Sequence, residues 1–153
     1  MEPSPVPRES RTPITGSSIT AVTQRWRTTL HADVNHTGDA WGVRLPWRDG
    51  GVFLAAASAM SEADTGQIWQ LACRLSADKL TVSKNLITEI FDKCLSAGLT
   101  ASERKPVSEW VVQQNPPPGS LVDHDFGRLR VRMDRVAVDR VDLVLVAPDT
   151  RQR

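Results

Sequence analysis

Residues 61–99 constrain the fold most, because their apolar side chains recur at helical spacing twice in succession. Ser61 followed by Asp64 is typical of a helix start, since a serine oxygen can accept from a free backbone N–H group and an acid suits the positive end of a helix. Apolar residues then recur every three or four positions, at Ile68, Leu71, Ala72 and Leu75. This spacing predicts a first amphipathic helix.

A second helix is predicted from Ser83 to the residues just before Gly98. Its apolar residues fall on one side: Leu86, Ile87, Ile90, Phe91, Cys94 and Leu95. Gly98 marks the end, because glycine readily adopts the left-handed conformation that closes many helices. Burying the apolar side chains of the pair, roughly 15–30 kcal/mol, does not offset the roughly 60 kcal/mol needed to order residues 61–99. We therefore expect the pair to pack on the neighbouring strand-like segments.

Strand-like segments lie on both sides of the helical pair. Four segments are predicted as extended: residues 40–47, 51–57, 107–113 and 128–147. Asp49-Gly50 separates the first two, and Asp-Gly is a strong hairpin signal. A turn near Asp139 divides the last segment into two strands, in which apolar residues alternate with polar ones.

The expected architecture is a single α+β domain over residues 19–148. It combines an antiparallel sheet of about five strands, the pair of amphipathic helices packed on it, and a short N-terminal helix over residues 19–30. Residues 1–18 contain four prolines and few apolar side chains, which predicts a flexible N-terminal arm. Residues 149–153 are predicted as a polar, charged C-terminal tail.

Charge and composition disfavour several classes of function. The chain has 153 residues and a formal net charge of +1, so no overall positive field attracts nucleic acid. No apolar run reaches the roughly 18 residues of a membrane span, so no membrane contact is expected. The first residues lack the basic start and apolar stretch of a signal peptide, which favours a cytoplasmic protein. Cys73 and Cys94 are interpreted as buried free thiols rather than as a disulfide.

Part of the helical pair resembles a DNA-binding motif. Val82-Ser83 opens the second helix and Ala97-Gly98-Leu99 closes it, a spacing similar to that of the recognition helix in winged-helix DNA-binding domains. The resemblance implies that residues 71–75 form the supporting helix, with three side chains facing the major groove: Lys84, Asn85 and Thr88. Residues 61–99 hold four basic and five acidic side chains, which weakens phosphate contacts, so DNA binding is kept as an alternative.

A basic stripe is a second candidate surface. Arg128, Arg130 and Arg132 would share one face of a strand and could contact phosphates. Three acids lie close enough to neutralise them across the predicted hairpin: Asp134, Asp139 and Asp142. A solvated face with cross-strand ion pairs is therefore the favoured interpretation.

Histidines and aspartates provide the only signal for chemistry. His31, His36 and His124 do not match the spacing of zinc ligands, so no metal site and no cofactor are predicted. In Asp123-His124-Asp125 a carboxylate could orient the imidazole as a base, which keeps a small α+β enzyme as a second alternative. No motif for a nucleophile accompanies these residues, and no catalytic residue is assigned.

Five tryptophans are spread along the chain, as packing in a shared core would produce, but more tryptophan than one small core can hide would leave some at the surface. Tryptophans left at the surface often anchor protein interfaces, and four are interface candidates: Trp26, Trp41, Trp47 and Trp110. The leading hypothesis is a non-catalytic binding or assembly component. It would act through protein–protein contacts of its sheet face and N-terminal arm, self-association into a homo-oligomer included.

Overall fold

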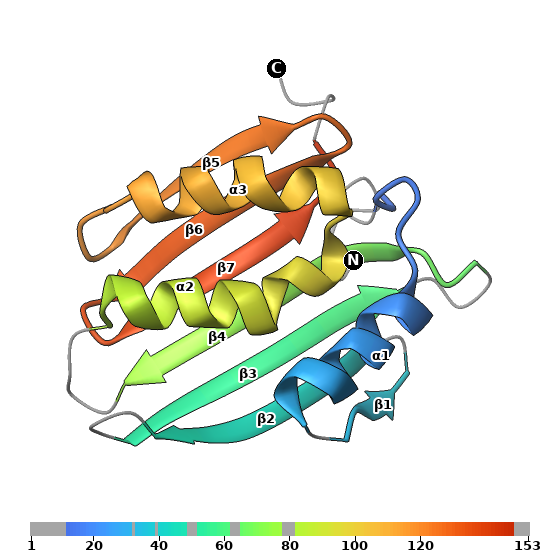
Figure 1. The fold of residues 1–153 in the computed structure, drawn as a ribbon, viewed down its shortest axis with the longest axis horizontal. Helices are drawn as coiled ribbons and strands as arrows, with labels where there is room; N and C mark the ends of the chain where they lie inside the picture. The colour runs from blue at the N-terminus through green and yellow to red at the C-terminus, as the bar shows by residue number, and fades with distance from the viewer. Residues whose placement is uncertain are drawn as a thin grey trace, which may run out of the picture.

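The described residues form one seven-stranded antiparallel sheet and three α-helices (Figure 1). The computed structural model describes residues 12–31, 33–38, 40–48, 52–61, 65–77 and 82–148, without the side chains of 44–48 and 52–56. The sheet order is β1-β2-β3-β4-β7-β6-β5. The strands are β1 (Asn35–Thr37), β2 (Ala40–Arg48), β3 (Val52–Ser61), β4 (Ile68–Ala77), β5 (Ser120–Phe126), β6 (Leu129–Ala137) and β7 (Arg140–Val146).

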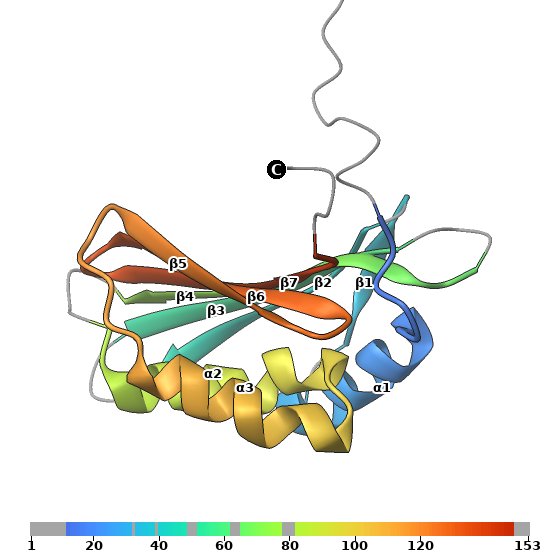
Figure 2. The same ribbon diagram turned by 90° about the horizontal axis from the view of Figure 1, so that it is seen from above.

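All the helices lie on one face of the sheet, and the opposite face carries none of them (Figure 2). They are α1 (Ile19–Leu30), α2 (Lys84–Lys93), the short 3₁₀ helix η2 (Leu95–Gly98) and α3 (Ala101–Gln113). Figure 1 shows α1 in front of β2 and β3, α2 in front of β4 and β7, and α3 in front of β5 and β6. None of the helices in the described part of the chain is long and apolar enough to cross a membrane.

The first helix of the predicted pair is wrong, because residues 68–77 form strand β4. Burial alternates along it: Leu71, Cys73 and Leu75 are buried under the helices, whereas Arg74 between them is exposed. The same apolar residues fit a helical period and a period of two, and pairing with β3 and β7 selects the strand. Ser61 ends β3 and caps no helix.

The predicted strand at residues 107–113 is also wrong, because these residues are the second half of α3. Glu103 accepts from the backbone N–H of Thr100 at 2.8 Å, which is half of a capping box and starts a helix. Val107 and Val111 lie one turn apart and are both buried against the sheet. The residues that start the helix, Thr100 and Glu103, lie outside residues 107–113. Taken alone, residues 107–113 fit a strand pattern.

The sheet is larger than expected, with seven strands in place of about five. Strands β1 and β5 were not predicted, since residues 35–37 and 120–126 are mostly polar. The helix at residues 19–30, the second helix of the pair and the hairpins β2–β3 and β6–β7 are confirmed. The domain is therefore still α+β, but it has three α-helices on one face instead of a central helical pair.

The segment before α1 packs on the sheet from residue 14 onward. Ile14 is buried, and its backbone N–H donates to the carbonyl of Ile68 at 2.8 Å. Ser17 accepts from the backbone N–H of Ile68 at 2.8 Å. The end of the predicted arm is thus attached to β4, and residues 1–11 and 149–153 lie outside the described part.

The core fills the space between the sheet and its helices. Trp26 of α1 is fully buried, and its indole N–H donates to the carbonyl of Cys94 at 3.0 Å. Cys94 forms a disulfide with Cys73 of β4, and neither residue is exposed. The prediction of free thiols is therefore wrong. Cys73 lies on strand β4 and Cys94 at the end of α2, which packs over the sheet, so the two sulfurs meet.

Candidate functional site

The uncovered face of the sheet carries a network of ion pairs over β5, β6, β7 and β4. Arg130 donates to Asp125 at 2.6 Å, and Arg132 lies 3.8 Å from Asp123. The hydrogen bond from Arg130 lowers the pKa of Asp125. The sequence predicted cross-strand pairs here but took the acids from the β6–β7 hairpin; the partners of Arg130 and Arg132 come instead from β5, a strand that was not predicted.

The same network continues across the sheet through Asp142 of β7. Its carboxylate lies 3.3 Å from both Arg74 of β4 and Arg140 of its own strand. Each of the four arginines in this network lies within 4.0 Å of an acid: Arg74, Arg130, Arg132 and Arg140. The face therefore presents paired charges and no basic stripe for phosphates.

Arg128 leaves the predicted stripe altogether and joins four segments of the chain. It lies in the β5–β6 turn and makes a bidentate pair with Glu103 of α3, at 2.7 and 2.8 Å. It also donates to the carbonyls of Thr15 at 2.6 Å and Gly98 at 3.1 Å. The hydrogen bond from Arg128 lowers the pKa of Glu103, and Glu103 raises the pKa of Arg128. Arg128 is thus a structural residue.

Loss of the Glu103 carboxylate should destabilise the fold in a pH-dependent way. The pKa of Glu103 is lower in the folded protein, so its ionised form stabilises the fold above the unfolded pKa, and this contribution is lost as the pH falls. We expect Glu103→Gln to lower the free energy of unfolding by about 1–3 kcal/mol at pH 7. The difference from wild type should shrink below about pH 4. Urea unfolding of both proteins at pH 7 and pH 3 measures this difference in the free energy of unfolding.

The matched control for this prediction is Glu89, which pairs with Lys93 at 3.0 Å on the exposed side of α2. Glu89→Gln should change the free energy of unfolding by no more than about 0.5 kcal/mol, since exposed pairs contribute little. Equal losses for Glu103→Gln at both pH values would contradict the assigned role.

His124 is separated from the two aspartates beside it in sequence. Alternation along β5 puts Asp123 and Asp125 on the uncovered face, where they pair with arginines, and His124 on the helix side. There its ring centroid lies 4.8 Å from that of Phe126 and 6.1 Å from that of Trp110. Neither aspartate can orient this imidazole as a base, so the enzyme hypothesis loses its only arrangement of residues.

The winged-helix alternative loses its supporting helix, because residues 71–75 belong to β4. The three candidate residues lie at the start of α2. Lys84 donates from Nζ to the carbonyl of Val112 at 2.8 Å, and Thr88 donates to the carbonyl of Lys84 at 3.0 Å. Asn85 is exposed. Lys84 thus holds the end of α3, and the element before α2 in the described residues is strand β4 instead of the supporting helix of the motif.

The tryptophan candidates divide into core and surface residues. Trp26 is interior, as described above. Trp41 is half-buried, donates to Ser61 at 3.0 Å, and stacks on His36 with ring centroids 3.6 Å apart. Trp110 is half-buried on α3 and meets Phe126 edge to face. The side chain of Trp47 lies outside the described part.

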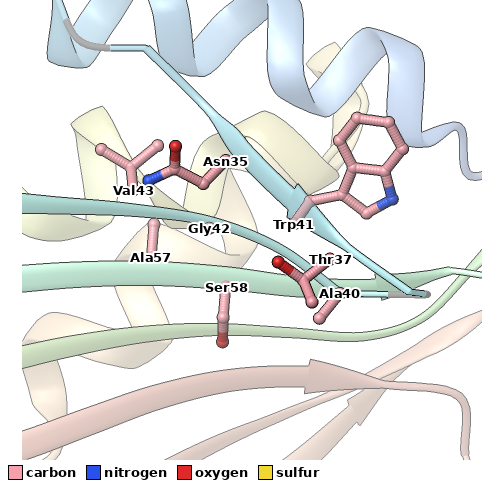
Figure 3. A pocket seen from close by; sticks show the side chains of 8 residues that line it. All are labelled: Asn35, Thr37, Ala40, Trp41, Gly42, Val43, Ala57 and Ser58. Atoms are coloured by element: carbon pink, nitrogen blue, oxygen red, sulfur yellow. The ribbon is translucent and has the colours of Figure 1, made fainter.

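A hollow of about 320 Å³ lies at the β1 edge of the sheet, beside the paired strands β1 and β2. Its lining comes from β1, β2 and β3: Asn35, Thr37, Ala40, Trp41, Gly42, Val43, Ala57 and Ser58. Figure 3 shows Trp41, Val43 and Ala57 pointing toward the helices, and Ala40 and Ser58 pointing the other way. The hollow is therefore a notch in the sheet edge rather than an enclosed pocket.

Four exposed apolar residues lie on or beside elements that meet at one end of the molecule, which we call the apolar end: Val112, Leu121, Val136 and Val138 (Figure 1). They are the large hydrophobic residues that are exposed within the described part, at 39–53%. Figure 1 shows the end of α3, the start of α2 and the β6–β7 turn together at this end. No sequence pattern marks these residues, since each is a single apolar residue near a turn or an element end.

Hydrogen bonds hold the parts of the apolar end together. The carbonyl of Val138 accepts from Val82 at 3.0 Å, and the carbonyl of Val112 accepts from Lys84. The backbone N–H of Gly119, just before β5, donates to the carbonyl of Arg135 at 2.7 Å. The apolar end is therefore built on anchored backbone and adjoins the start of the edge strand β5.

Within the described ranges, no three His, Cys, Asp or Glu side chains gather in a way that could hold a metal ion. Comparison with known proteins adds no relative: no family model, no curated protein and no solved structure matches this chain.

Proposed function

We propose that this protein is a non-catalytic binding component that associates with another protein through the apolar end. The observation that carries the proposal is that four exposed hydrophobic residues, Val112, Leu121, Val136 and Val138, lie on or beside elements that meet at one end of the domain (Figure 1). Single exposed hydrophobic residues are common on protein surfaces, but a cluster of them favours a contact with another protein. The helix-covered face is filled by the core, so its residues are not free for such a contact.

Charge supports a contact at this end rather than on the middle of the uncovered face. Arg74, Arg130, Arg132 and Arg140 are each within 4.0 Å of an acid on that face. A partner would have to remove water from these pairs, which costs free energy. Burying the exposed apolar side chains of the apolar end is favourable.

Site-specific photo-cross-linking tests the proposal. A benzoylphenylalanine at position 136 or 138 should capture a defined polypeptide in cells that produce the protein. The same residue at position 21 or 24, on the exposed side of α1, should capture none. Mass spectrometry identifies the captured chain as another protein or as a second copy. Cross-linking that is equal at all four positions, or absent at all of them, would contradict the proposal.

A further inference from the structure

We propose that the partner binds by adding a β-strand to the outer edge of β5, and that this strand carries basic residues at alternate positions. The inference rests on the proposed function and names the chemistry of the partner. β5 is an edge strand of the sheet, and its outer side pairs with no strand of the described chain. An extended peptide can complete such an edge with backbone hydrogen bonds.

The backbone of β5 is set up for this pairing. Gly127 and Arg128 form a two-residue turn between the paired residues Phe126 and Leu129, and such a closing pair is hydrogen-bonded. Alternation along the strand then directs the N–H and C=O groups of Leu121, Asp123 and Asp125 away from β6. Three residues therefore offer both a donor and an acceptor to an added strand.

The two edges of the sheet differ in their protection. At the other edge, β1 is only three residues long, and β2 beyond it contains Pro46, which has no N–H to donate. β5 has seven residues, holds no proline and no lysine, and pairs with β6 without a register shift. Of the usual devices that block strand addition, β5 carries only charged side chains, Asp123 and Asp125, and it lacks a proline, a lysine and a bulge.

The side chains of β5 indicate which strand would fit. Asp123 and Asp125 lie on the uncovered face with 40% and 53% of their side chains exposed, and the arginines that pair with them come from β6, on the inner side of β5. Residues placed opposite them would favour lysine or arginine, because opposite charges across a strand pair are stabilising. On the helix side, Val122 and Phe126 are half-buried, and Trp110 lies beside Phe126. Apolar residues are favoured there.

A second copy of this chain fits the same edge less well. Pairing two β5 strands antiparallel over their full length places Asp123 opposite Asp123 of the other copy. Shifting each strand by one residue toward its C-terminus places Asp123 opposite Asp125. The opposite shift avoids this pair only by leaving Asp125 outside a ladder of residues 120–124. Like charges opposite each other are destabilising, whereas a strand with alternating valine and lysine meets no such repulsion.

Binding of a designed peptide tests the inference. The probe is a nine-residue peptide of alternating valine and lysine with fluorescein at its N-terminus, titrated with the full chain and followed by fluorescence anisotropy. Saturable binding is expected. The double variant Asp123→Lys/Asp125→Lys should bind at least tenfold more weakly. Glu89→Lys/Asp92→Lys changes the net charge equally on α2, and it should bind as the wild type does.

Two further measurements separate strand addition from simple charge attraction. The same peptide, N-methylated at every residue, has the same charge but lacks backbone donors on both edges, and it should not bind. If the lysine variant is unfolded by circular dichroism, Asp123→Asn/Asp125→Asn replaces it, with at least a threefold loss expected. The inference would be overturned if the methylated peptide bound as tightly as the unmethylated one. It would also be overturned if the β5 variant and the α2 variant bound the peptide equally well.

The outcomes also distinguish this inference from the proposed function. Position-specific cross-links at the apolar end without peptide binding would leave the proposed function standing and reject strand addition. A stable dimer in size-exclusion chromatography with light scattering, dissociated by the lysine variant at β5, would show that a second copy occupies the edge and would also reject the basic partner.

Discussion

Truncation of Trp26 to alanine is expected to lower the free energy of unfolding by about 3–5 kcal/mol. The side chain is fully buried between α1 and the sheet, so the change leaves a large cavity. It also removes the indole donor from the carbonyl of Cys94, and an unpaired buried carbonyl adds to the cost. Urea unfolding followed by far-ultraviolet circular dichroism measures the loss.

Two variants test this assignment of Trp26 to the core. Trp26→Phe keeps most of the volume but not the donor, so we expect an intermediate loss of about 1–3 kcal/mol. Trp110→Ala, on a half-buried tryptophan of α3, should cost clearly less than Trp26→Ala. A loss below about 1 kcal/mol for Trp26→Ala would place this residue at the surface, where its sequence-based interpretation as an interface anchor put it.

Removal of the disulfide is the second change with a large expected effect. Cys73 and Cys94 are 21 residues apart in sequence, and a bond closing a loop of this length stabilises the fold by about 3 kcal/mol in the chain-entropy description. The variant Cys73→Ala/Cys94→Ala should lose about this amount. Wild-type protein unfolded in urea with dithiothreitol should show a similar loss.

The state of the two sulfurs in the purified protein is the control for that experiment. Under denaturing conditions without reductant, a thiol assay should find no free thiol, and it should find two after reduction. Since both residues are fully buried, the bond should resist reductant in the folded protein and break when denaturant opens it. Two free thiols before reduction would contradict the bond, and the double variant should be insensitive to dithiothreitol.

Local signals were sufficient for several elements of the fold. Ser83 accepts from the N–H of Leu86 as an N-cap, and the apolar side of α2 is buried as its spacing predicts. The Asp-Gly pair lies between β2 and β3, and alternation in β6 and β7 matches their burial. In these cases sequence neighbours make the contacts that define the element, so the pattern and the structure agree.

Partners distant in sequence decided the rest. Residues 68–77 fit two periods, and only β3 and β7 on either side make them a strand. β5 is mostly polar, and its pairing with β6 turns Asp123 and Asp125 toward arginines and His124 away from both. The sequence by itself determined an α+β domain, α1, α2 and two hairpins. The tertiary structure alone decided the seven-stranded sheet, the disulfide and the apolar end, because each joins segments that no local pattern relates.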